Sequence, residues 1–168
     1  MSNDESLKET GRCAAAALVE MVAALECDYD RLEELRDERG DSTAGDPDAE
    51  AWDKANPELF DKLLELEETA GECTSREEAE TRIQEDALSV EVRSGWVAPS
   101  DGFEPCEFQI LLSTGGPASR IMGELDEHNE PARAWLEVQD WGTPWTQYFD
   151  IEQDTLLAYA RCFYFGEG

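Results

Sequence analysis

The sequence contains few residues with which catalysis could begin. His128 is the only histidine of the chain, and it lies in the polar stretch Asp126–Pro131. A general base or metal ligand needs partner side chains that converge on it from rigid elements, and none stands at motif spacing from His128. We therefore expect a solvated loop histidine and no enzymatic activity, with a catalytic His128 as the alternative.

The cysteines and glycines give no catalytic signature either. The five cysteines are widely spaced, no CxxC is present, and nothing resembles a thiol-enzyme motif, so free cytosolic thiols are expected. The glycine-rich stretch Ser113–Pro117 lacks the lysine of a phosphate-binding loop, and its context favours a hairpin turn. Asp28-Tyr29-Asp30 begins like a calcium loop, but the glycine and glutamate that such a loop requires are replaced by Glu33 and Arg39. No catalytic residue, metal site or cofactor is predicted.

Charge is the dominant property of the chain. The 41 acidic and 13 basic residues give a formal net charge of -28 and a pI near 4.1. Residues 1–88 hold 27 acids and 9 bases, whereas residues 89–168 hold 14 and 4. Because phosphates are bound through Lys and Arg, this balance argues against direct nucleic-acid binding and against anionic membranes. It predicts a partner with a basic surface.

The acids of the first half fall on helix faces away from the leucines. Carboxylates at every second or third helical residue approach the order of charge density of duplex DNA. Two interpretations stay open: mimicry of a polyanion that fills a basic DNA or RNA site, and acidity that serves only solubility or salt adaptation. Under the first, the expected partner-binding acids are Glu26, Asp28, Asp30, Glu33, Glu34, Asp37, Glu38, Glu65, Glu68, Glu77 and Glu78.

Aromatic residues gather in a short segment of the second half. Trp135, Trp141, Trp145, Tyr148 and Phe149 lie within fifteen residues of one another. One interpretation is a core plug beneath the last helix. The other is a partner contact, because Trp and Tyr are frequent interface anchors. Trp141 and Trp145 are the expected anchors in that case.

The elements that position these residues differ between the two halves. Helical periodicity or capping signals predict helices over residues 7–25, 30–39, 57–71 and 75–88, with a break at 40–47. Alternating apolar residues then predict strands over 88–92, 106–112, 119–125 and 132–138, and a closing helix is expected over 151–165. The fold class is α+β: an acidic helical half (1–88), then a three- to four-stranded antiparallel sheet with a C-terminal helix (89–168), packed as one compact unit.

No stretch is long and apolar enough to predict a membrane helix, because the best candidate, residues 13–25, is short and contains Glu20. The acidic first residues do not resemble a secretory signal. The predicted location is the cytoplasm.

Three segments carry a resemblance to known proteins: residues 111–118 (LLSTGGPA), 123–126 (GELD) and 141–146 (WGTPWT). Through them the second half resembles uncharacterised small proteins of bacteriophages and mobile elements. The acidic first half is similar in kind, not in motif, to phage anti-restriction and anti-CRISPR proteins that mimic nucleic acid. The resemblance implies an inhibitor of a host defence complex and assigns no site residue. Monomer and homodimer both remain open.

Overall fold

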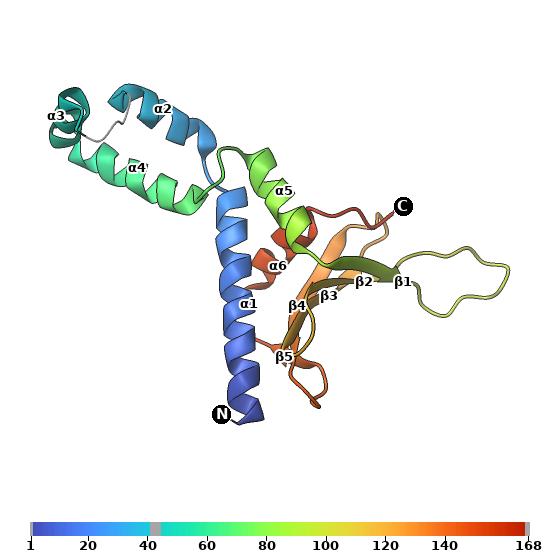
Figure 1. Ribbon diagram of the computed structural model, residues 1–168. Helices are drawn as coiled ribbons and strands as arrows, with labels where there is room; N and C mark the ends of the chain where they lie inside the picture. Colours follow the sequence, from blue (N-terminus) through green and yellow to red (C-terminus); the bar gives the residue numbers. More distant parts are fainter. Residues whose placement is uncertain (1, 41–44, 167–168) are drawn as a thin grey trace. The chain divides into compact units, whose positions relative to one another are not determined.

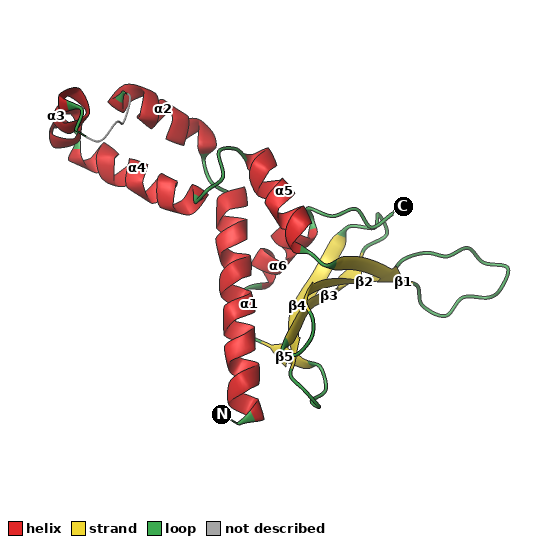
Figure 2. Cartoon of the chain, in the orientation of Figure 1, coloured by secondary structure: helices red, strands yellow, loops and turns green. Residues whose placement is uncertain are grey.

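The computed structural model describes residues 2–40 and 45–166, so most of the expected break at 40–47 lies outside the described residues. The elements, in chain order, are α1 (Asn3–Leu25), α2 (Tyr29–Arg39), α3 (Pro47–Ala55), α4 (Pro57–Ala70), α5 (Arg76–Asp86), β1 (Ser89–Arg93), β2 (Glu107–Ser113), β3 (Ala118–Leu125), β4 (Pro131–Gln139), β5 (Thr146–Tyr148) and α6 (Gln153–Ala160). The α+β class is confirmed (Figures 1 and 2).

The chain forms two compact units. Residues 1–22 and 81–168 form the first, called the sheet unit, and residues 23–80 form the second, called the helical unit. This division differs from the expected boundary at residue 88, because residues 3–22 of α1 and residues 81–86 of α5 belong with the sheet. Sequence periodicity identifies these helices but not the neighbours on which they pack.

The sheet unit contains a five-stranded antiparallel meander in the order β1-β2-β3-β4-β5. The sheet thus has one strand more than the upper end of the expected three to four, since the three-residue β5 is too short to show an alternating pattern. The Thr114–Pro117 stretch connects β2 to β3 as predicted. One face of the sheet is buried through Phe108, Ile110, Ile121 and Leu136, each at most 1% exposed.

Two glycines let segments approach closely within the sheet unit. A Cβ on Gly11 of α1 would lie 2.1 Å from the Tyr148 ring of β5. A Cβ on Gly123 of β3 would lie 2.3 Å from both the Phe108 ring and the carbonyl oxygen of Arg133. These positions need glycine because the neighbouring atoms occupy the space of a side chain.

The C-terminal helix α6 packs on β4 but is shorter than expected. It ends at Ala160 instead of near residue 165, and its Leu156, Tyr159 and Ala160 are buried as predicted. Beyond it, the Phe165 ring packs against Phe108 at a centroid distance of 4.7 Å. Phe165 therefore covers part of the sheet from a segment without helical structure.

The helical unit has a small core of its own. Leu32, Leu35, Leu63, Leu66 and Ala70 are buried together. Helix α4 begins at Pro57 and is followed by Gly71, as the sequence predicts.

Side chains cap the N-termini of two other helices, α3 and α5. The nine-residue α3, which periodicity did not predict, starts with Pro47 after an Asp46 carboxylate that accepts from the Asp48 amide. At the start of α5, the Ser75 hydroxyl accepts from the Glu78 amide, which confirms the predicted capping sequence. No described helix combines the length and apolar composition needed to cross a membrane.

Candidate partner-binding surfaces

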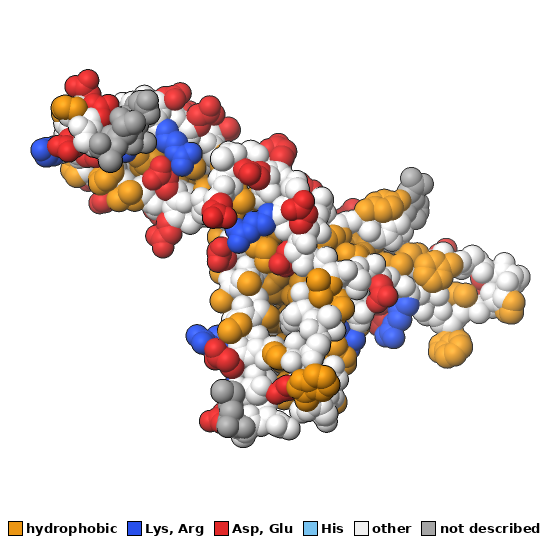
Figure 3. Space-filling view, viewed as in Figure 1, with side chains coloured by type: hydrophobic (Ala, Val, Ile, Leu, Met, Phe, Trp, Pro, Cys, Tyr) orange, Lys and Arg blue, Asp and Glu red, His pale blue; other side chains and the backbone are white. Residues whose placement is uncertain are grey.

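Acidic side chains cover the helical unit. Residues 23–80 contain 21 acids and 6 bases, a net of -15, while the longer sheet unit contains 20 and 7, a net of -13. Figure 3 shows Asp and Glu distributed over α2, α3 and α4. All eleven predicted partner-binding acids are exposed. Glu26 and Asp28 lie between α1 and α2; Asp30, Glu33, Glu34, Asp37 and Glu38 on α2; Glu65 and Glu68 on α4; Glu77 and Glu78 on α5.

Several of these acids also have structural roles. The Asp28 carboxylate accepts from the Arg31 amide at 3.0 Å and caps α2. The Glu78 carboxylate accepts from the side chain and the backbone of Thr74, and these hydrogen bonds lower the pKa of Glu78. In contrast, five of the eleven acids form neither a side-chain hydrogen bond nor an ion pair with any described residue; they are named here the open carboxylates: Glu26, Asp30, Glu33, Asp37 and Glu68.

The basic side chains are largely engaged by neighbouring acids. At least ten of the thirteen form ion pairs: Lys8, Arg12, Arg31, Arg36, Arg39, Lys62, Arg82, Arg93, Arg120 and Arg133. Exposed pairs of this kind contribute little to stability. They matter more for phosphate binding, because a base already paired to a carboxylate is a poor ligand for phosphate.

The best-formed ion pair of the helical unit joins α2 to α3. Arg39 donates to the two carboxylate oxygens of Asp53 at 2.7 and 2.8 Å, and these hydrogen bonds lower the pKa of Asp53. At the other end of α2, the Tyr29 hydroxyl donates to the Ala24 carbonyl, and burial raises the pKa of Tyr29 to about 12. These contacts hold the acidic helices in a fixed arrangement, which is what a charged surface needs in order to match a partner.

The other face of the sheet is open and carries a connected polar network. The Arg120 guanidinium donates to Glu137 at 2.8 Å and to Gln109 at 2.7 Å. The same guanidinium lies 4.1 Å from the centroid of the Trp145 ring, and this cation–π contact holds the Trp145 side chain half-buried. The Trp135 indole donates to the same Glu137. Trp145 is thus anchored on the open face and is not part of the core.

The aromatic segment does not form a core plug. Trp141 and Phe149 are each 76% exposed, so that interpretation is wrong for both. Trp141 lies beside the β2–β3 turn, where a Cβ on Gly116 would approach its indole nitrogen to 2.6 Å. Exposure leaves Trp141 available for a partner, and its anchoring role stays a prediction.

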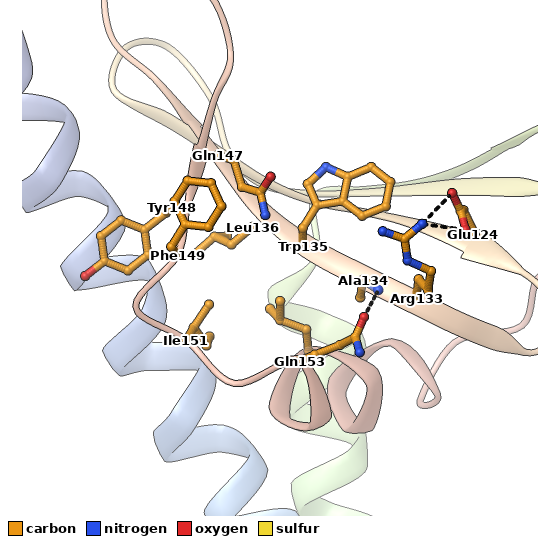
Figure 4. A pocket seen from close by; sticks show the side chains of 11 residues that line it. Glu124, Arg133, Ala134, Trp135, Leu136, Gln147, Tyr148, Phe149, Ile151 and Gln153 are labelled. Carbon is orange, nitrogen blue, oxygen red and sulfur yellow. Dashed lines mark hydrogen bonds and ion pairs between the residues drawn. The ribbon is translucent and has the colours of Figure 1, made fainter.

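A hollow of about 540 Å³ opens where β4, β5 and the segment before α6 meet (Figure 4). Trp135, Phe149 and Ile151 contribute apolar surface, and Arg133 forms an ion pair with Glu124 at 3.2 Å on its rim. The hollow therefore offers a contact surface, and its lining contains no nucleophile–base pair.

His128 lies exposed in the β3–β4 turn, and its Nε2 is 3.4 Å from the carboxylate of the adjacent Glu127. The preceding Asp126 carboxylate accepts from the amides of His128 and Glu130, which shapes the turn and lowers the pKa of Asp126. All five cysteines are free thiols. Across residues 2–40 and 45–166, no group of three or more His, Cys, Asp and Glu side chains could hold a metal ion.

Sequence reasoning missed the most exposed apolar segment. The loop between β1 and β2, residues 94–106, carries Trp96, which is fully exposed, together with the exposed Val97 and Phe103. Figure 3 shows hydrophobic side chains standing out on this loop, to the right of the view. The available signal was the position of Trp96 and Phe103 among glycines, prolines and serines, where neither a strand nor a buried helix is expected.

These features define an acidic α+β protein with an open sheet face, exposed aromatic residues and a separately packed acidic helical unit. No protein-family model matches the chain, and no curated protein or solved structure is significantly similar to it. The resemblance to proteins of phages and mobile elements therefore stays a prediction.

Proposed function

We propose that this chain is an inhibitor of a host CRISPR or restriction complex. It binds a basic DNA- or RNA-binding site of that complex through the acidic surface of the helical unit, without catalysis. It works in the cytoplasm of the host cell, where such complexes meet nucleic acid. The single observation that carries the proposal is the exposure of all eleven predicted acids on a helical unit that has its own packed core.

The arrangement of charge favours a basic partner. The open carboxylates lie on or beside α2 and α4, the two helices that supply the leucine core of the helical unit. Fixed carboxylates lose less conformational entropy on binding than those of a flexible acidic tail. Complementary charge mainly accelerates association and suppresses wrong partners, so such a surface selects cationic sites.

The same arrangement argues against direct nucleic-acid binding. Phosphate contacts require Lys or Arg side chains that can displace counterions, and at least ten of the thirteen bases here are paired with carboxylates. Trp141 supplies apolar anchoring in the proposed complex, since aromatic side chains contribute much of the affinity of protein interfaces.

The proposal is tested by displacement. A fluorescein-labelled duplex is bound to each member of a panel of purified restriction enzymes and CRISPR surveillance complexes, and its polarisation is followed as the chain is added. We expect displacement from at least one member, with an inhibition constant that weakens steeply between 50 and 300 mM NaCl, as counterion release requires. Failure to displace the duplex from any member at 50 mM NaCl refutes the proposal.

Two matched variants separate a specific surface from bulk acidity. The helical-unit variant neutralises the open carboxylates: Glu26→Gln, Asp30→Asn, Glu33→Gln, Asp37→Asn and Glu68→Gln. The sheet-unit variant neutralises five exposed acids of the sheet unit: Glu85→Gln, Glu104→Gln, Glu127→Gln, Glu130→Gln and Asp150→Asn. Both have the same net charge. Weakened inhibition by the first variant alone supports the proposal; unchanged inhibition by both supports acidity that serves only solubility or salt adaptation.

A further inference from the structure

Strand β1 is an edge of the sheet with an unusual set of exposed apolar neighbours. It pairs only with β2 and ends the strand order. Leu88 just before it is 57% exposed, Val92 within it is 36% exposed, and Trp96 just after it is fully exposed. Unpaired edges normally carry features that discourage another strand from joining them. Glu91 and Arg93 are exposed charges of that kind, but exposed apolar side chains flank them.

The residues around Val92 are self-complementary when read in both directions. One position away on either side are Glu91 and Arg93, which have opposite charges. Four positions away on either side are the exposed Leu88 and Trp96. An antiparallel copy aligned on Val92 therefore places each Glu91 opposite an Arg93 and each Leu88 opposite a Trp96.

The backbone of β1 presents the correct groups for this alignment. The Arg93 carbonyl accepts from the Cys106 amide and therefore points toward β2. Because backbone groups alternate in direction along a strand, the N–H and C=O of Val90 and Val92 point to the free edge. In an antiparallel pair aligned on Val92, the two Val92 residues face each other as a hydrogen-bonded pair, and Val90 faces Ser94 in the same way.

Side chains on the open face extend the match across four strands. Arg93 already forms an ion pair with Glu107 of β2, and Glu91 accepts from Gln109 of β2. Addition of a second β1 gives the row Glu107, Arg93, the partner's Glu91 and the partner's Gln109. Along this row the charges of Glu107, Arg93 and the partner's Glu91 alternate, and the neutral Gln109 amide donates to Glu91; the row occurs twice because the arrangement is symmetric.

We propose that two copies of this chain dimerise through antiparallel pairing of their β1 strands, with the two-fold axis at Val92. The two five-stranded sheets join into one continuous sheet of ten strands. Trp96 of each copy covers Leu88 of the other, which removes the most exposed apolar side chain of the chain from water. The proposal does not depend on the inhibitor function, because it uses a different surface of the molecule.

Net charge gives this dimer a distinctive salt dependence. Each copy has a formal charge of -28, so the copies repel each other at low ionic strength. Salt screens this long-range repulsion. Dimerisation therefore strengthens as NaCl rises from 50 to 500 mM, whereas binding to a basic partner weakens over the same range. Because the two salt dependences have opposite signs, a NaCl titration distinguishes failure of the dimer proposal from failure of the inhibitor proposal.

The test is sedimentation velocity of the full chain from 1 to 200 µM in 500 mM NaCl, with two charge variants and one control variant. Glu91→Arg places two arginines opposite each other, and Arg93→Glu places two glutamates opposite each other. The dimer dissociation constant of each variant alone should therefore rise about tenfold or more. An equimolar mixture of the two restores a complementary Glu–Arg contact at both positions and should form a mixed dimer. Trp141→Ala, an exposed tryptophan outside β1, is the control and should dimerise like the unmodified chain.

Recovery in the mixture keeps the test independent of folding, because a misfolded variant is not rescued by another. Trp96→Ala should also weaken the dimer, and circular dichroism checks that its fold is retained. A chain that stays monomeric at 200 µM in 500 mM NaCl overturns the proposal. So does a dimer that tolerates Glu91→Arg and Arg93→Glu, since it uses another surface.

Discussion

The contact between Gly11 and Tyr148 determines whether the start of α1 belongs with the sheet. Alanine is a better helix former than glycine by about 1 kcal/mol, so helix propensity alone predicts that Gly11→Ala stabilises the chain. In the structure, however, the new Cβ would lie 2.1 Å from Cδ2 and 2.6 Å from Cγ of Tyr148. Because Cγ is at the base of the ring, a small rotation does not relieve the clash, and β5 has to move.

The two effects oppose each other, and their sizes decide the sign. Overpacking of this kind costs about 1–3 kcal/mol, and the movement of β5 brings the cost to the upper part of that range. We therefore expect Gly11→Ala to lower the free energy of unfolding by about 1–2 kcal/mol after the gain in helix propensity. Urea unfolding followed by circular dichroism measures this change.

A double-mutant cycle isolates the contact from the propensity. In a Tyr148→Ala background the ring is absent, and Gly11→Ala should then stabilise the chain by about 1 kcal/mol. The sign of the substitution thus reverses between the two backgrounds. If Gly11→Ala stabilises the chain with Tyr148 in place, the N-terminal part of α1 does not pack on β5, and the division of the chain into its two units is wrong.

Two further predictions concern the sheet unit. Gly123→Ala should destabilise it by about 3 kcal/mol or more, because the new Cβ meets the buried Phe108 ring on one side and rigid backbone on the other; urea unfolding measures this, and near-normal stability contradicts the assigned β2–β3 register. Burial and a hydrogen bond to Asp86 raise the pKa of Tyr159 above its ordinary value near 10, so its stabilising contribution is complete below pH 10 and is lost as the pH rises beyond it. The free energy of unfolding should therefore fall between pH 9 and 11.5, and the fall should be smaller in Tyr159→Phe; equal slopes for both proteins would show that the phenol is not buried.

The elements that local chemistry specifies could be predicted from the sequence. The proline at the start of α4, the Ser75–Glu78 capping pair and the glycines of the β2–β3 turn each act within a few residues of themselves. The alternation in β2 and β4 likewise reports a sheet with one buried face. The α+β fold class could be predicted because these local signals agree with one another along the chain.

Features set by distant contacts could not be predicted. Strand β5 exists because it pairs with Leu136, Glu137 and Val138 of β4, and its three residues have no pattern of their own. The position of Trp145 depends on Arg120, which lies 25 residues earlier, and so its distance from the core was not evident. The exposure of the acids was predictable from helical periodicity, whereas no local pattern specifies what such a surface binds.

The most direct test of the central claim compares the two matched charge variants in the displacement titration. Five screened charge contacts at about 0.4 kcal/mol each amount to about 2 kcal/mol, which corresponds to an inhibition constant weakened about 30-fold. The account predicts this loss for neutralisation of Glu26, Asp30, Glu33, Asp37 and Glu68. It predicts less than a threefold change for neutralisation of the five acids of the sheet unit. Equal inhibition constants for the two variants would contradict the claim that the helical unit carries the binding surface.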